Sequence, residues 1–250
     1  MSGIPVESMI SSKEDYRFFL EADRLALCKD RKRPRLIDDG WRFQRLLRKV
    51  EYYMNCKRSP LHRAYLLFLL ARFYWLSKKL GFTISPNTIG PGLCLAHRGN
   101  ILISPYAHIG ENFRIHAMTS IGSEVRYGDK AATIGNNVYV GPGAKLFGEI
   151  VIGDDVAIGA NAVVTHSFEE PHQTVAGVPA RKVSDKGTEE LLVRATEIVR
   201  ARGAKAPAPA GSPVGATAPR GRPAAPSYSR VSRVSRRIGL RKGTEDGDSD

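Results

Sequence analysis

A six-residue spacing of small and apolar residues runs through the middle of this 250-residue chain. An α-helix repeats every 3.6 residues and a single strand every two, so neither produces a period of six. A parallel β-helix does, because each six residues then form one short strand and one corner, and three such units make a coil of about 18 residues. The series consists of Ile89, Leu95, Ile101, Ala107, Phe113, Thr119 and Val125, then Ile134, Val140, Leu146, Ile152, Ile158 and Val164. We expect about four stacked coils.

One break interrupts this spacing. Val125 and Ile134 are nine positions apart where six are expected, so three additional residues within the segment 126–133 have to leave the β-helix as a loop. Functional residues are often carried by loops on a rigid scaffold. The loop is therefore a candidate part of a site.

Composition divides the rest of the chain. Residues 1–80 are rich in aromatic, leucine and basic residues, and the apolar spacing over 41–80 predicts two helices. We expect this N-terminal helical region to cover the open end of a β-helix at 81–187, whose first coil would otherwise expose unpaired backbone groups. Docking of its Arg-rich face on a membrane surface is the alternative. A helix is expected at 188–203 and a disordered tail at 204–250, which is poor in apolar residues.

Charge and cysteine content limit the function classes. The net charge is +13, but it is divided between the tail and the helical region, and no nucleic-acid-binding motif is present. An anionic cofactor or a membrane surface explains the charge as well as a nucleic acid does. The three cysteines show no C-x-x-C spacing, which favours reduced thiols in a cytoplasm. The start of the chain shows no secretory signal, and no apolar run reaches the roughly 20 residues of a membrane span, so we expect a soluble protein.

The repeat ends in Ala176-Gly177-Val178-Pro179-Ala180-Arg181. Together with the six-residue units and the nine-residue step, this ending resembles the left-handed β-helix acyltransferases, in particular the serine O-acetyltransferases and their relatives in polysaccharide gene clusters. The resemblance covers about residues 41–187. It implies left-handed coils, acetyl transfer from acetyl-CoA to a hydroxyl group, and homotrimers or pairs of trimers with active sites between subunits.

The resemblance implies that His97 is the general base. A hydroxyl group has to lose its proton as it attacks a thioester, and neutral imidazole suits that task near pH 7. His116 is a second candidate, because Leu95 and Phe113 should stack about 4.8 Å apart in adjacent coils, which would place both histidines on one face. An exposed histidine without a role remains the alternative for each. We assign no role to the other four histidines.

This chain departs from the serine acetyltransferase pattern in several places. Thr83 and Ala96 stand where that family carries aspartates, and the loop reads Asp129-Lys130-Ala131-Ala132 where the family has Asp-Arg-His-Pro. Lys130 could still attract a substrate carboxylate, although without the bidentate fork of an arginine. His97 then needs another orienting partner, and His116 and Asp129 are the candidates.

Small residues in the later coils would let the pantetheine arm of acetyl-CoA run close to the backbone. These residues are Gly141, Gly143, Ala144, Gly159 and Ala160. Corner geometry alone would also account for the glycines. Lys145, Arg181 and Lys182 are candidates to meet the cofactor's phosphates. We expect no metal, because the chain lacks the two histidines five apart that mark zinc carbonic anhydrases of this fold.

We therefore predict an acetyl-CoA-dependent O-acetyltransferase that works by direct attack in a ternary complex. L-Serine is the first candidate acceptor, and a sugar hydroxyl in a polysaccharide precursor is the second. A β-helix scaffold without activity is the third possibility. Cys94 lies close to His97 in the sequence, but its side chain should point in another direction, so no acyl-enzyme is expected.

Overall fold

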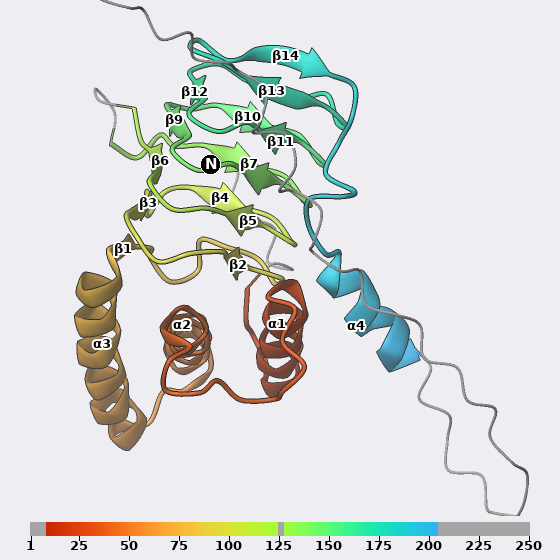
Figure 1. Ribbon diagram of the computed structural model, residues 1–250. Helices are drawn as coiled ribbons and strands as arrows, with labels where there is room; N and C mark the ends of the chain where they lie inside the picture. Colours follow the sequence, from red (N-terminus) through yellow and green to blue (C-terminus); the bar gives the residue numbers. More distant parts are fainter. Residues whose placement is uncertain (1–8, 125–127, 205–250) are drawn as a thin grey trace, which may run out of the picture. The chain divides into compact units, whose positions relative to one another are not determined.

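The computed structural model describes residues 9–124 and 128–204. Helices α1 (Lys13–Ala26), α2 (Asp39–Cys56) and α3 (Pro60–Leu80) precede the strands, and α4 (Ala195–Ala204) follows them (Figure 1). α2 and α3 occupy the range in which the sequence predicts two helices. The helix expected from residue 188 begins only at Ala195, because turns occupy most of the preceding residues. Except for the end of α4, the predicted disordered tail lies outside the described residues.

The strands are short and form three sheets. They are β1 (Phe82–Thr83), β2 (Cys94–Leu95), β3 (Ile101–Ile103), β4 (His108–Ile109), β5 (Arg114–Ile115), β6 (Thr119–Gly122), β7 (Thr133–Ile134), β8 (Tyr139–Val140), β9 (Lys145–Phe147), β10 (Val151–Ile152), β11 (Ala157–Ile158), β12 (Val163–Val164), β13 (Thr174–Ala176) and β14 (Arg181–Ser184). The sheet orders are β1-β3-β6-β9-β12, β10-β7-β4 and β14-β13-β11-β8-β5-β2. Every pair is parallel except β13 with β14. The three coils that run from β3 to β11 each contribute one strand to each sheet, so the predicted parallel β-helix is confirmed (Figure 1).

The predicted phase of the repeat is wrong in the first coils. Leu95 pairs with Ile115, 20 positions later, and does not stack on Phe113. In the neighbouring sheet, Ile103 pairs with Ile121, 18 positions later. Two additional residues therefore leave the coil between β2 and β3.

The loop between β6 and β7 is also longer than predicted. Ile109 pairs with Ile134, 25 positions later, which is seven more than the roughly 18 of an uninterrupted coil. Both errors have one cause, since each six-residue unit turns two side chains inward and both are small or apolar. Phe113 and Ile115, for example, are both 0 % exposed. A period of six therefore fits either inward position equally well.

The first coil has no earlier coil to pair with, and α2 takes the place of one. Gln44 Nε2 donates to the carbonyl oxygen of Leu93 at 2.7 Å, and Gln44 Oε1 accepts from the N–H of Leu95 at 3.2 Å. A neighbouring parallel strand would make these same two bonds. The prediction that helices cover the open end is thus confirmed at this strand.

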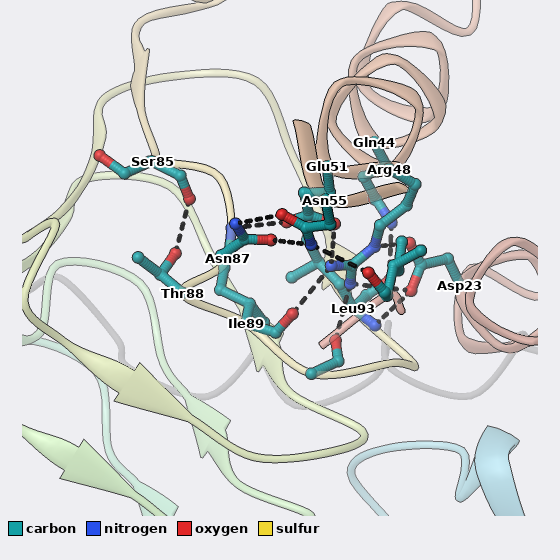
Figure 2. A network of polar contacts seen from close by, with 12 residues as sticks. Asp23, Gln44, Arg48, Glu51, Asn55, Ser85, Asn87, Thr88, Ile89 and Leu93 are labelled. Atoms are coloured by element: carbon teal, nitrogen blue, oxygen red, sulfur yellow. Dashed lines mark hydrogen bonds and ion pairs between the residues drawn. The ribbon is translucent and has the colours of Figure 1, made fainter. Parts of the chain in front are cut away.

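Arg48 of α2 covers the next stretch of the same coil. Its guanidinium is 0 % exposed and donates to the carbonyl oxygens of Ile89 and Gly90 at 2.8 and 2.7 Å (Figure 2). Two buried carboxylates balance its charge, because Arg48 Nε lies 2.9 Å from Asp23 and Arg48 Nη1 lies 3.1 Å from Glu51. A cation is tolerated here since all of its partners are present.

The two carboxylates also accept backbone hydrogen bonds from the coil. Asp23 Oδ1 of α1 accepts from the N–H groups of Gly92 and Leu93, and Glu51 Oε1 accepts from the N–H of Asn87 at 2.9 Å (Figure 2). Helix and coil also share one apolar core, in which Phe43 of α2 packs on Phe82 of β1. The helices are therefore part of the β-helix's folding unit. Among the described helices, none has the length and apolar character needed to cross a bilayer.

We expect Arg48→Met to lower the free energy of unfolding by about 3–5 kcal/mol, because it leaves two buried carboxylates without their cation. Urea denaturation at fixed protein concentration measures this loss. Arg45→Met, at a half-buried position on the same helix, is the control and should cost about 0.5 kcal/mol or less. Equal losses in the two variants would contradict the role given to Arg48.

Candidate active site

One corner of the β-helix carries most of the candidate residues. Here strands β2, β5, β8 and β11 lead into β3, β6, β9 and β12, which belong to the neighbouring five-stranded sheet. In successive coils this site corner consists of residues 96–100, 116–118, 141–144 and 159–162. The corners stack one on another, so residues far apart in the sequence form a single continuous edge.

His97 and His116 lie next to each other at the site corner. Their ring centroids are 5.5 Å apart, and the ring of His116 lies 5.2 Å from that of Tyr139 in the next coil. The prediction that the two histidines share a face is therefore confirmed, although the register used to derive it was wrong. The two additional residues after Leu95 shift His97 into this position.

Arg114 is the polar partner of His116. Arg114 Nε donates to His116 Nε2 at 3.5 Å, so a neutral His116 carries its own hydrogen on Nδ1. The pKa of His116 is lowered, first by partial burial and then by the charges of Arg114 and His97. His116 is therefore largely neutral at neutral pH.

A pocket of about 230 Å³ opens beside His97. One wall is formed by Leu95 at the end of β2 and by residues 96–98 of the site corner. The other wall is the segment that joins α1 to α2 and begins α2. We call it the His97 pocket. A larger cavity of about 560 Å³ lies between α3 and the sheet that contains β1, β3 and β6, and Met118, Asn100 and Lys145 line it. Open space thus flanks the site corner on both sides.

Close packing accounts for the glycines of the site corner. Gly143 has a φ of +76°, and a Cβ there would collide with the side chain of Asn161 in the next coil. A Cβ on Gly141 would lie 2.8 Å from the backbone nitrogen of Ala160. Ala144 is 0 % exposed and points into the core, so only its backbone could face a cofactor. Corner geometry therefore explains these residues whether or not a cofactor binds.

The three candidate phosphate partners differ in their surroundings. Lys145 Nζ donates to the carbonyl oxygen of Met118 and faces the larger cavity. Arg181 and Lys182 begin β14 on the last coil and are exposed. The pKa of Lys182 is raised, chiefly by its hydrogen bond to Asp185. Its charge is thus partly balanced already.

Asp129 and Lys130 lie away from the histidines within this chain. They belong to the connection between β6 and β7, which turns a different corner from the one that carries His97. Lys130 Nζ forms a 2.7 Å ion pair with Glu149. That Asp129 and Lys130 lie close to His97 stays a prediction, and the loop that carries them would have to come from a second subunit.

Cys94 is unsuited to covalent catalysis. Its side chain packs against Ala22 and Ala26 of α1 and Ala195 of α4, away from the site corner. Burial raises the pKa of its thiol to about 11, so the thiolate is scarce at neutral pH. The described residues include no group of three or more His, Cys, Asp or Glu side chains that could hold a metal ion.

Sequence reasoning missed two sets of residues around His97 and His116. Arg114 and Tyr139 each precede an inward-facing residue of the corrected repeat. A sequence analysis in the correct register would therefore have placed them together on the face that carries His116. Asp38, Asp39 and Trp41 line the His97 pocket, and their position depends on how the helices dock. No local pattern in the sequence indicates that docking.

We expect the pKa of His116 to lie below the usual value of about 6.5 and to rise in Arg114→Met, because that variant removes a cation that opposes protonation. NMR titration of the imidazole Cε1–H resonance measures both values. Arg63→Met, on the exposed face of α3, is the control and should leave the titration unchanged. An unchanged pKa in Arg114→Met would refute the assigned cause.

Comparison with known proteins finds similarity to a hexapeptide transferase family and to serine acetyltransferases. The family model "Bacterial transferase hexapeptide (six repeats)" matches residues 131–166. A serine acetyltransferase of Helicobacter pylori strain J99 is 35 % identical over 123 residues, which cover 45 % of this chain and 71 % of that protein. The serine acetyltransferase of Mycobacterium tuberculosis is 37 % identical over 105 residues, which cover 41 % of this chain but only 45 % of that protein.

Solved structures extend the similarity to the fold. A serine acetyltransferase from Brucella abortus in complex with coenzyme A has a TM-score of 0.56 and 25 % identity, covering 72 % of each chain. A serine acetyltransferase from Neisseria gonorrhoeae in complex with serine has a TM-score of 0.55 and 25 % identity, covering 69 % of this chain and 71 % of that one. The shares of this chain that these structures match are larger than the segment 131–166 that the family model matches.

Proposed function

Because this chain belongs to the serine acetyltransferase family of hexapeptide-repeat transferases, which fold as left-handed β-helices, we propose that it transfers the acetyl group of acetyl-CoA to the hydroxyl of L-serine. The observation that carries the proposal is the placement of His97 at the site corner, beside a small pocket and in contact with His116. This arrangement offers a proton acceptor to a bound hydroxyl group.

The reaction we propose is a direct transfer. His97 takes the hydroxyl proton as the oxygen attacks the thioester carbonyl, so that a C–O bond forms and the C–S bond then breaks. Backbone N–H groups would stabilise the negative charge on the carbonyl oxygen. The CoA thiolate leaves and receives the proton from His97. No covalent enzyme intermediate is needed, in keeping with the buried thiol of Cys94.

His116 acts as a positioning residue for His97. Its ring contacts His97 on one side and Tyr139 on the other, while Arg114 holds its Nε2 atom. A neutral His116 adds no charge that would oppose proton uptake by His97. Asp129 is retained as a second candidate for orienting His97, from a neighbouring subunit.

The cofactor would lie along the site corner. Its pantetheine arm could approach the backbone closely at Gly141, Gly143, Ala144, Gly159 and Ala160. The amide groups of the arm would then pair with exposed N–H and C=O groups of that backbone. Lys145, Arg181 and Lys182 would meet the phosphates. A structurally similar enzyme, the Brucella abortus serine acetyltransferase, was solved with coenzyme A, which supports this choice of cosubstrate.

We propose a homotrimer, or a pair of trimers, as the working unit. The loop with Asp129 and Lys130 turns a different corner from His97, and a neighbouring subunit is the simplest way to bring such a loop to the histidines. Lys130 would then face the acceptor's carboxylate. The three unpaired cysteines suit a reducing compartment such as the cytoplasm.

One observation favours a second candidate function, acetylation of a sugar hydroxyl. Thr83 and Ala96 replace two carboxylates typical of the family, and Lys130 replaces an arginine. Fewer charges at those positions would suit a neutral acceptor. The scaffold alternative predicts no acetyl-CoA binding.

We expect thiol release from acetyl-CoA in the presence of L-serine, and a fall in kcat by about 10²- to 10⁴-fold in His97→Asn, because the general base is lost. A thiol-reactive dye measures the rate, and the KM for acetyl-CoA should change little. His62→Asn, which alters a partly exposed histidine on α3, is the control with unchanged activity.

The acceptor panel decides between the candidate functions. Activity with sugars and none with L-serine would assign the protein to polysaccharide modification. Full activity in His97→Asn would show that His97 is not the base. Absence of both turnover and acetyl-CoA binding would leave the scaffold alternative.

A further inference from the structure

We propose that the outer face of α3 docks on an anionic lipid bilayer. The outer face consists of the row Leu61, Phe68 and Trp75 and of the cations Arg72 and Lys79 beside it. The apolar side chains would enter the headgroup region, and the cations would contact lipid phosphates. This inference goes beyond the proposed function and does not depend on which acceptor the protein uses.

α3 is apolar on two faces. Its inner face packs on α2 and joins the core shared with the β-helix. On the outer face, Leu61, Phe68 and Trp75 are 84, 54 and 65 % exposed. A surface helix that packs on one side only ordinarily has a polar outer face. The inner residues in the shared core are Leu69, Phe73, Leu76 and Leu80.

The exposed apolar residues of the helices are concentrated on α3. Leu61, Phe68 and Trp75 follow one another at seven positions, so they lie along one line of the helix. Among the described helices, α1 has no exposed large apolar side chain, and α2 and α4 have one each, Met54 and Ile198. Exposed apolar residues that occur singly need no explanation, whereas a contiguous patch marks an interaction surface.

Two cations lie beside the aromatic residues of the row. Arg72 and Lys79 each come four positions after one of them, on the same side of the helix. Cζ of Arg72 lies 5.9 Å from the ring centroid of Phe68, and Nζ of Lys79 lies 5.6 Å from that of Trp75. At a membrane interface, aromatic rings settle at the headgroup level, and long basic side chains extend to the phosphates.

The charge of α3 has a single sign. Its cations are Arg63, Arg72, Lys78 and Lys79, and it contains no Asp or Glu. Within residues 9–124 and 128–204, Lys79 alone of the four forms an ion pair, a 3.8 Å contact with Asp39. Anionic lipids attract such a basic, apolar helix face through their surface potential.

The same charge disfavours a second copy of this chain as the partner. Two α3 helices packed face to face would bring cations together, and neither helix could offer a carboxylate. An anionic bilayer supplies the opposite charge. Because α3 does not meet the requirements for crossing a bilayer, it would lie in the plane of the interface, with its apolar face about 5–10 Å deep.

Docking leaves the cap of the first coil intact. The coil is held by Gln44 and Arg48 of α2, whereas α3 lies at the outside of the helical region (Figure 1). Membrane contact through the outer face therefore needs no change in the contacts between helices and coil.

Tryptophan fluorescence tests the insertion directly. The chain has two tryptophans, the buried Trp41 and the exposed Trp75, so Trp41→Phe leaves Trp75 as the sole reporter. We expect vesicles of phosphatidylcholine and phosphatidylglycerol to shift its emission to the blue, and brominated acyl chains to quench it. Vesicles of phosphatidylcholine alone should have a weaker effect, and added salt should reduce binding.

Co-sedimentation of the full-length protein with the same vesicles measures the contribution of each part. We expect Phe68→Ser/Trp75→Ser to lower the partition coefficient by about 10-fold or more, and Arg72→Gln to lower it by about fivefold. The matched controls are Tyr106→Ser, at a half-exposed aromatic residue of the β-helix, and Lys186→Gln, at an exposed cation after β14. Both should bind as the wild type does, and urea denaturation checks that every variant is folded.

Three results would overturn the proposal. The first is a wild type that does not bind the anionic vesicles. The second is binding that persists in Phe68→Ser/Trp75→Ser and in Arg72→Gln while the emission of Trp75 stays unquenched, which would place the contact on another segment. The third is a lower molar mass in Phe68→Ser/Trp75→Ser by sedimentation equilibrium without vesicle binding by the wild type, which would make the outer face an interface between copies of this chain.

Discussion

The open backbone edge of the first coil is the constraint on which the rest of the structure depends. In a parallel β-helix each coil satisfies the N–H and C=O groups of the next, so the first coil must find partners elsewhere. Gln44, Arg48 and Asp23 supply them from two helices that lie about 40 to 70 positions earlier in the sequence than their partners. The charges of Arg48 and Asp23 are fully buried and compensate each other. The first coil and the helices therefore fold as one unit, with a fixed position of α1 and α2 against the coil (Figure 2).

This fixed position builds the candidate site. The segment between α1 and α2 is brought against the first corner of the β-helix, where it closes one side of the His97 pocket. The other side is the corner that contains two more residues than a regular repeat. That local surplus places His97 against His116 of the next coil. Arg48 and Gln44 of α2 hold the coil, while His97 and Arg98 at its corner line the pocket.

The chemistry of the site corner agrees with direct acetyl transfer. His116 is kept neutral by partial burial and by the charge of Arg114, which leaves His97 as the residue that would accept a proton. The thiol near it is buried and protonated. The charged groups that line the His97 pocket come from the helical region and the first corner, in a chain that lacks several charged residues typical of its family.

The sequence by itself determined the parallel β-helix, because an inward-facing position every six residues must be small or apolar. It also predicted that His97 and His116 share a face, although from a register that the structure corrects. It did not determine the phase of the repeat. Phe113 and Ile115 both face inward, so one period fits two registers, and the length of the loop before β7 was underestimated as a result. Only the tertiary structure decided the capping of the first coil and the His97 pocket. Contacts such as Asp23 with Leu93, 70 positions apart, arise from the docking of helices on the coil and leave no periodic or local signal in the chain.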